Sequence, residues 1–265
     1  MQQFLVIGAT GVMGTAAIQA IRALHGADAR VCGVWYGRED NLQEIDGVDA
    51  LLFADIGDPA TFDAIATRFG TRFDWCFFAT ALGDVGFPVA EATAEQVAAA
   101  NRLSFDPLPR LEERFEIGTL VAYSTFYNLA HQKITYGAMG HSKHAIEAWA
   151  LQPGRSRRRC LRAGAFQSAS SQGIKLLVRR RAKQLAESND PLLRSFFAGA
   201  KPSEAVERLE RAVLDEERAC FGDSGTDLAA LAAAHRELLA DTGPAPFLNV
   251  AGQRTWTSAE ALPLD

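Results

Sequence analysis

A turn with three glycines constrains the fold of this chain more than any other feature of its sequence. The apolar run at residues 3–7 lacks polar alternation, which is typical of a strand buried on both faces of a sheet. Glycines follow at once, and the apolar spacing of residues 12–26 predicts a helix. Glycines let the backbone turn tightly and approach a pyrophosphate, and the start of a helix offers free N–H groups. The sequence predicts a strand–turn–helix unit that binds a dinucleotide through Gly8, Thr10, Gly11, Val12, Met13 and Gly14.

Strand-like and helix-like segments alternate along most of the chain. Buried-strand patterns occur at residues 3–8, 29–36, 48–56, 73–82, 118–125, 158–165 and 246–252. Helical patterns occur at residues 12–26, 59–70, 90–115 and 138–151, and a bend or break is expected near Pro107. Such alternation produces right-handed crossovers between parallel strands. We therefore predict an α/β fold, a Rossmann-type doubly wound parallel sheet of about seven strands.

Residues 170–242 interrupt the alternation and have a mostly helical pattern. In a doubly wound fold, an insert of this kind lies over the carboxyl ends of the strands and shapes a substrate pocket. The chain has 265 residues and no flexible linker, so we predict a single domain over residues 1–265 that includes this helical region.

Composition narrows the classes of partner. A net charge of -5 argues against nucleic-acid binding and favours a small-molecule substrate. The four cysteines, at positions 32, 76, 160 and 220, form no CxxC pair. This pattern is typical of a protein of the reducing cytoplasm and argues against disulfide bonds and a zinc site. The first eleven residues lack a basic segment before their short apolar run. We expect a cytoplasmic protein without a membrane span.

The end of the second predicted strand bears on the choice of cofactor. An NAD site usually has an Asp or Glu there, which binds the ribose 2′-hydroxyl. Trp35 and Tyr36 occupy that place here, and Arg38 follows them. A guanidinium suits a 2′-phosphate, so NADPH is favoured, while the neighbouring acids at 39 and 40 keep NADH open. Asp55, after the third strand, could bind the adenine amino group or cap the next helix.

Tyr136 and Lys143 stand seven residues apart in the segment 134–148. Seven helical residues turn through about 700°, within about 20° of two full turns, so the two side chains can share a face. If Tyr136 lies just before the helix, it can still fold back over the lysine. Met139, four residues before Lys143, cannot transfer a proton and is interpreted as a packing residue against cofactor or substrate.

These motifs together resemble the short-chain dehydrogenase/reductase family. The resemblance rests on the sequences GATGVMG at 8–14, ADI at 54–56 and FFATALG at 77–83, and on Asn101, Ser124 and Lys143. It implies cofactor contacts at Asp55, Ile56, Ala79, Thr80 and Ala81. It also implies that Ser124 orients substrate or tyrosine, with Thr125 as the neighbouring alternative, and that Asn101 holds a bent helix and a water.

Within that family, YGAMGHSKHAIEA at 136–148 resembles the enoyl-acyl carrier protein reductases, whose tyrosine and lysine are seven apart. The segment 162–175 is similar to the loop beside the nicotinamide in that branch, which implies cofactor contacts at Gly164, Phe166 and Ser168. Ala165 replaces the usual proline, and the glycine motif is closer to that of atypical members. Pro153 and Gly154 end the helix soon after Lys143, so a homo-oligomer is possible but in doubt.

The resemblance implies that Lys143 binds the nicotinamide ribose and that Tyr136 donates to the substrate carbonyl. Three hypotheses stay open: an NADPH-dependent reductase of enoyl thioesters, a carbonyl reductase that uses Ser124, and a non-catalytic NADP-binding sensor or scaffold. His141 and His144 lack a third ligand, so no metal site is predicted. Two arginine clusters, at 155–162 and 179–183, are interpreted as solvated surface or as a docking face for an acyl carrier protein or coenzyme A.

Overall fold

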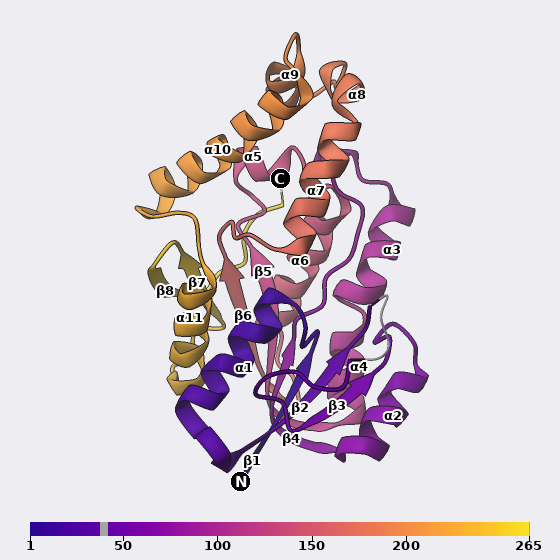
Figure 1. Cartoon of the computed structure of the whole chain (residues 1–265), viewed down its shortest axis with the longest axis vertical. Helices are drawn as coiled ribbons and strands as arrows, with labels where there is room; N and C mark the ends of the chain where they lie inside the picture. The colour runs from indigo at the N-terminus through magenta and orange to yellow at the C-terminus, as the bar shows by residue number, and fades with distance from the viewer. Residues whose placement is uncertain (38–41, 265) are drawn as a thin grey trace.

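The computed structural model describes residues 1–37 and 42–264, which contain one continuous sheet (Figure 1). Its strand order is β3-β2-β1-β4-β5-β6-β7-β8, and all neighbours are parallel except β7 and β8. The strands are β1 (Gln2–Ile7), β2 (Ala29–Trp35), β3 (Ala50–Phe53), β4 (Arg72–Phe78), β5 (Glu116–Thr125), β6 (Arg157–Ala163), β7 (Phe247–Ala251) and β8 (Arg254–Ser258). The order reverses between β1 and β4, and in doubly wound sheets ligands bind at this point.

The predicted α/β sheet is therefore confirmed, with one strand more than expected. All seven predicted strands are present, and β8 adds an antiparallel edge. Its sequence, RTWTS, is short and half-exposed, so it lacks the continuous apolar run that identified the others.

Each face of the sheet carries its own apolar core, because successive side chains of a strand point to opposite faces. In β1, Leu5 and Ile7 enter one core, while Phe4 and Val6 enter the other. The first core is covered by α2 (Ala60–Phe69), α4 (Pro107–Arg114) and α6 (Gly137–Leu151). The second is covered by α1 (Val12–His25) and α11 (Leu228–Ala240), which lie side by side (Figure 1).

The expected bend near Pro107 separates two helices, α3 (Ala94–Ser104) and α4. The Asn101 carbonyl accepts hydrogen bonds from the N–H groups of both Phe105 and Asp106, each at 2.9 Å. These two hydrogen bonds end α3. Pro107 then begins α4, and proline is tolerated at the first position of a helix because its missing N–H would have no partner there.

A second group of helices lies beyond the carboxyl ends of the strands (Figure 1). It contains α5 (Ala130–Lys133), α7 (Ala169–Arg180), α8 (Ala182–Ala186), α9 (Pro191–Phe197) and α10 (Pro202–Phe221). These helices share a small apolar core that includes Ile134, Val178, Leu193 and Leu209. Two 3-10 turns, η1 (Gly26–Asp28) and η2 (Val89–Glu91), complete the assignment.

The last helix of the region 170–242 differs from the expectation that this whole region shapes a substrate pocket. α11 packs beside α1 on the sheet, because Ala230, Leu231, Ala234 and Leu238 form an apolar stripe at helical spacing. It is the crossover helix between β6 and β7. No helix among the described residues is long and apolar enough to span a bilayer.

Candidate functional site

The glycine turn after β1 has the geometry of a phosphate cradle. Gly8 has φ 86°, a conformation that favours glycine, and a Cβ there would lie 2.6 Å from the Ala79 carbonyl oxygen. A Cβ at Gly14 would overlap the Gly8 carbonyl oxygen, so α1 can approach β1 only without a side chain at that position. Gly11 caps α1 without a side-chain hydrogen bond, and the first turn holds no acidic residue. The first N–H groups of α1 therefore remain available to an anion.

The predicted cofactor residues gather along neighbouring strand ends. Gly8 follows β1, Ala79–Ala81 follow β4, Ser124 lies at the end of β5, and Gly164 follows β6. Ala79 N–H donates to the Ile7 carbonyl at 2.7 Å, and the Thr80 hydroxyl donates to the Leu103 carbonyl at 2.7 Å. Thr10 and Gly11 are exposed, and Val12 and Met13 are half-buried. These strand ends flank the point where the strand order reverses between β1 and β4, which is where ligands bind in doubly wound sheets.

The ends of β2 and β3, where the adenosine part of a cofactor is expected, contain exposed aromatic rings. Tyr36, after β2, is 61% exposed and stacks on Phe53 at the end of β3, with ring centroids 5.3 Å apart. Asp55 Oδ1 accepts a hydrogen bond from the Gly57 N–H at 2.8 Å, and Ile56 is buried in the core. Asp55 thus closes the local turn, but it does not cap α2, whose N-cap residue is Pro59 and has no side-chain cap bond. Arg38, the residue expected to bind a 2′-phosphate, lies outside the described residues.

Tyr136 and Lys143 both belong to α6, with Tyr136 at its N-terminal end and Lys143 near its middle. Tyr136 is the N-cap residue and is half-buried, so it lies just before the helix. Burial raises the pKa of its hydroxyl, which keeps the phenol protonated at neutral pH. Its hydroxyl has no hydrogen-bond partner among the described residues, so it can donate to a ligand.

Lys143 is only 6% exposed, and its Nζ donates to the Tyr123 carbonyl at 2.9 Å. An ammonium has three donors, and this carbonyl is its only acceptor in the described part of the chain. Burial lowers the pKa of Lys143 to about 8, because a buried ammonium loses its hydration. A ligand that accepts the two remaining hydrogen bonds would stabilise the charged form.

Ser124 and Asn101 are committed to protein partners. The Ser124 hydroxyl donates to Glu147 Oε1 at 2.6 Å, and the neighbouring Thr125 hydroxyl donates to the Ala163 carbonyl at 2.8 Å. Asn101 Oδ1 accepts from the Ser142 hydroxyl at 2.7 Å, which ties α3 to α6. The predicted contact of Asn101 with a water in the site stays a prediction. No direct hydrogen bond joins Ser124 to Tyr136 in the described structure.

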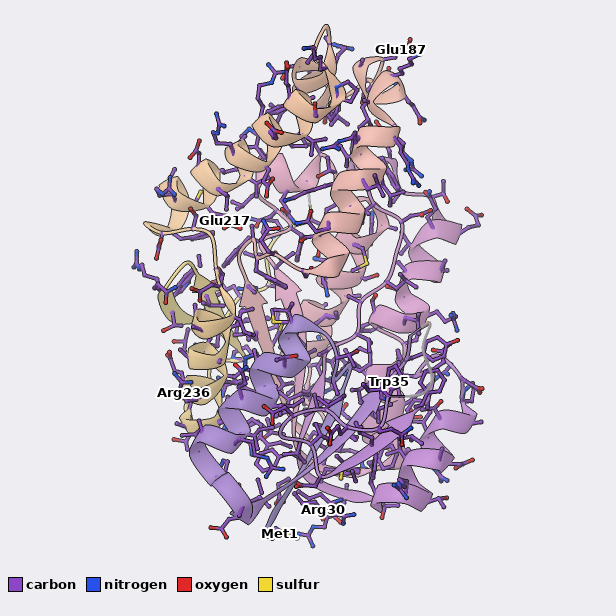
Figure 2. All side chains as sticks on the ribbon, in the orientation of Figure 1. Met1, Arg30, Trp35, Glu187, Glu217 and Arg236 are labelled. Carbon is purple, nitrogen blue, oxygen red and sulfur yellow. The ribbon has the colours of Figure 1, made fainter. Side chains whose placement is uncertain are left out.

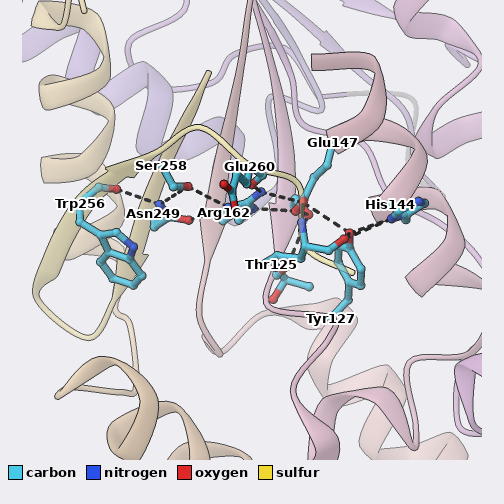
Figure 3. Close-up of polar contacts among 11 residues, drawn as sticks. Thr125, Tyr127, His144, Glu147, Arg162, Asn249, Trp256, Ser258 and Glu260 are labelled. Carbon is cyan, nitrogen blue, oxygen red and sulfur yellow. Dashed lines mark hydrogen bonds and ion pairs between the residues drawn. The ribbon is translucent and has the colours of Figure 1, made fainter. Parts of the chain in front are cut away.

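A buried ionic network beside the site was not anticipated from the sequence (Figure 3). Arg162 on β6 makes two 2.8 Å hydrogen bonds to the Glu147 carboxylate on α6, and both side chains are at most 2% exposed. Glu147 Oε2 also accepts from the Leu262 N–H at 2.8 Å. The Tyr127 hydroxyl donates to the Leu262 carbonyl at 2.7 Å, so the network anchors the C-terminal segment to α6.

The structure corrects both interpretations of the first arginine cluster for two of its residues, Arg159 and Arg162. Arg158 pairs with Glu112, Arg159 with Asp241, and Arg162 with Glu147. Arg159 and Arg162 are almost fully buried, so neither a solvated surface nor a docking face describes them. Their partners lie far away in the sequence, which is why the spacing of the arginines gave no sign of them.

The loop after β6 is held by the C-terminal half of the chain. Ala165 N–H donates to Glu217 Oε1 on α10 at 2.7 Å, and the Ala165 carbonyl accepts from the Thr226 N–H at 3.0 Å. Phe166 packs against the core beneath α1 and α11. Ser168 caps α7 by accepting from the Ser171 N–H at 3.0 Å. Glu217 is a second residue that sequence reasoning missed.

The two histidines of α6 serve different contacts. His141 Nε2 lies 3.0 Å from the Val89 carbonyl oxygen, and His144 Nδ1 lies 3.1 Å from the Tyr127 hydroxyl. Met139 is buried between α3 and the loop after β4, with its sulfur 3.8 Å from the Ser104 hydroxyl. It packs as expected, but these contacts are with protein rather than with a ligand.

Comparison with solved structures places this geometry in a known fold. The chain is 17% identical to an NAD+-bound xylitol dehydrogenase over 91% of this chain and 92% of that one, with a TM-score of 0.60. A short-chain type dehydrogenase/reductase from Mycobacterium ulcerans gives 16% identity, coverages of 95% and 89%, and a TM-score of 0.61. Levodione reductase gives 19% identity, 91% coverage of each chain, and a TM-score of 0.56.

The chain has the fold of short-chain dehydrogenases/reductases. No family model matches its sequence, and no curated protein matches it either. In many short-chain reductases the tyrosine stands four residues before the lysine. In this chain the residue four before Lys143 is Met139, which is buried. Among the residues of α6 and its N-cap, the tyrosine is Tyr136.

Proposed function

We propose that this protein is an NADPH-dependent reductase that delivers hydride to the β-carbon of an α,β-unsaturated thioester. The observation that carries the proposal is the buried Lys143 ammonium of α6, which uses one of its three donors, together with the unpaired hydroxyl of Tyr136 at the N-cap of the same helix. The reversal of strand order between β1 and β4 supports binding of a dinucleotide, and Arg38 favours the 2′-phosphate of NADPH over NADH on sequence grounds.

The cofactor, when bound, supplies the hydride. Lys143 holds the ribose hydroxyls with its free donors. Tyr136 donates a hydrogen bond to the thioester carbonyl as negative charge builds on that oxygen. The raised pKa of Tyr136 keeps this donor protonated, and its half-buried position limits competition from water.

Reduction of a ketone is the second candidate. The names xylitol dehydrogenase and levodione reductase favour it, because those proteins act on an alcohol and on a dione. In the ketone hypothesis Ser124 assists Tyr136, but its hydroxyl already donates to Glu147. This engagement favours the enoyl substrate, for which Tyr136 alone suffices.

Purified protein given NADPH or NADH with matched enoyl and β-ketoacyl thioesters, carried on coenzyme A or on acyl carrier protein, tests the proposal. We expect nicotinamide oxidation with the enoyl thioester. Turnover on the ketone alone would overturn the enoyl proposal. Tight binding of NADPH without turnover on either would support a sensor or scaffold. An Arg38→Ala variant should weaken binding of NADPH far more than binding of NADH, and equal effects would contradict a 2′-phosphate contact.

Replacement of the proposed proton donor tests its role. Tyr136→Phe should reduce kcat by roughly 10²–10⁴-fold with little change in NADPH affinity, because a positioned donor is lost. Tyr127→Phe is the matched control, since its hydroxyl bonds to Leu262 and His144 within the protein. It should lower stability slightly and leave kcat near the wild-type value. Equal activity of Tyr136→Phe and wild type would show that another group is the acid.

A further inference from the structure

Glu217 is a buried carboxyl that lies against the loop following β6. It is 2% exposed and stands near the end of α10 that approaches the sheet (Figure 2). Its Oε1 accepts the Ala165 N–H at 2.7 Å. The family resemblance assigns this loop to the nicotinamide end of the cofactor, but no role for a carboxyl on α10 followed from the sequence.

The second carboxyl oxygen of Glu217 has no hydrogen-bond partner. Oε2 is fully buried and unpaired among the described residues. A Cβ on Gly164 would lie 2.9 Å from Glu217 Oε2, so the backbone of the loop packs directly against the carboxyl group. A buried acceptor without a partner is energetically costly, and either a proton or a ligand can relieve that cost.

No cation is paired with Glu217 in the described structure. Glu216, its neighbour on α10, accepts the N–H groups of Ala130 and His131 and pairs with the His131 ring at 2.7 Å. Further back on α10, Glu210 pairs with Lys175 of α7. After α10, Asp223 accepts the N–H groups of Ser224 and Gln253. The loop 164–168 itself, GAFQS, is uncharged.

In these surroundings the pKa of the Glu217 carboxyl lies near neutral pH. Burial raises the pKa of Glu217 to about 7, and the negative charge of Glu216 adds to the effect. The hydrogen bond from Ala165 acts in the opposite direction without cancelling it. A positive charge brought close to Glu217 would favour its carboxylate form, and a neutral group would not.

We propose that Glu217 is a positioning residue for the nicotinamide end of the cofactor, whose carboxylate form favours the oxidised cofactor and whose acid form favours the reduced one. The inference rests on the proposed function, which binds a nicotinamide cofactor, and on the family resemblance, which implies that the loop 164–168 contacts the nicotinamide end. The oxidised nicotinamide ring is positively charged and the reduced ring is neutral. Binding of the oxidised cofactor to the acid form therefore releases one proton from Glu217 to solvent, whereas binding of the reduced cofactor retains it.

Affinities of the wild-type protein for NADP+ and NADPH, measured by fluorescence titration from pH 6 to pH 8.5, test the proposal. The two forms carry the same phosphates, so the titration of those groups cancels in the ratio of their dissociation constants. We expect the ratio to move toward the oxidised form by at least about threefold as pH rises, since one pKa unit corresponds to about tenfold. Calorimetry in two buffers of different ionisation enthalpy should detect proton release with NADP+ only.

A matched pair of variants assigns the effect to one side chain. Glu217→Gln keeps the shape and an acceptor for Ala165 but cannot titrate, so the affinity ratio should become independent of pH. Glu207→Gln makes the same charge change on an exposed position of α10 and should retain the wild-type dependence.

Each outcome decides the inference. A pH-independent ratio in the wild type, or an unchanged dependence in Glu217→Gln, would overturn the role of Glu217 while leaving the proposed function intact. Failure to bind any nicotinamide dinucleotide would overturn both. If Glu217→Gln does not fold, the calorimetric proton release of the wild type still decides, because its absence contradicts the proposal.

Discussion

Arg162 occupies a position of β6 where a buried strand ordinarily carries an apolar side chain. Its guanidinium lies over the Phe247 ring at 3.8 Å from the centroid and binds Glu147 through two hydrogen bonds. The remaining donors reach the Asn249 amide oxygen, the Ser258 hydroxyl and the Glu260 carbonyl. Because every donor group is engaged, the buried charge is tolerated, and the network fixes the C-terminal segment against α6.

Removal of one partner from this pair should be costly. Arg162→Met leaves the Glu147 carboxylate buried without its cation, and we expect a loss of about 3–5 kcal/mol in the free energy of unfolding. Urea denaturation measures it. Arg72→Met is the control, because Arg72 and Glu116 are 79% and 74% exposed and such pairs contribute under about 1 kcal/mol. A double variant, Arg162→Met with Glu147→Gln, should recover part of the lost stability. If it recovers none, the loss does not come from the unpaired charge of the Glu147 carboxylate.

At the scale of elements, the glycine turn shows how one residue sets the approach of a helix to a strand. Gly14→Ala would force α1 away from β1, because a Cβ overlaps the Gly8 carbonyl. We expect a loss of about 1–3 kcal/mol in stability and weaker dinucleotide binding, since overpacking displaces the turn. Gly173→Ala on α7 is the control, because nothing lies within 4 Å of its Cβ position.

That control should gain up to about 1 kcal/mol, since alanine loses less backbone entropy than glycine in a helix. Thermal unfolding and NADPH titration of the two variants provide the comparison. Equal binding by Gly14→Ala and wild type would contradict the proposed cradle.

Elements and their order were predictable from the sequence because the signals are local. The apolar run before Gly8 and the helical spacing after it lie within one segment, as do the strand and helix patterns around Ser124 and Lys143. The ionic network and the Glu217 contact were not predictable. Their partners, Glu147 with Arg162 and Glu217 with Ala165, are separated by 15 and 52 residues and meet only through the sheet order.

At the scale of the whole molecule, two buried titratable groups oppose each other in their effect on stability. His235 on α11 is fully buried between the Leu231 carbonyl and the Tyr123 hydroxyl, and burial lowers its pKa to about 4. Between pH 6.5 and pH 4 the unfolded chain binds a proton that the folded chain does not, so acidification through this range lowers the free energy of unfolding.

Glu217 has the reverse sign. Its pKa is about 7 in the folded protein against an ordinary value of 4.5, so between these values the folded chain holds a proton that the unfolded chain has lost. Its contribution is therefore greatest below pH 4.5 and is lost as pH rises toward 7. At about 1.4 kcal/mol per pKa unit, the full shift corresponds to about 3 kcal/mol.

Glu217→Gln should separate these opposed contributions. The variant lacks the titrating carboxyl, so its free energy of unfolding, taken relative to the wild type, should rise by about 2 kcal/mol between pH 5 and pH 7.5. The variant should also lose more stability than the wild type on acidification below pH 6.5, since His235 is then unopposed. Urea unfolding at pH 5, 6, 7 and 7.5 measures both effects. Glu207→Gln, on the exposed side of α10, should run parallel to the wild type. A parallel curve for Glu217→Gln would mean that Glu217 is ionised throughout this range.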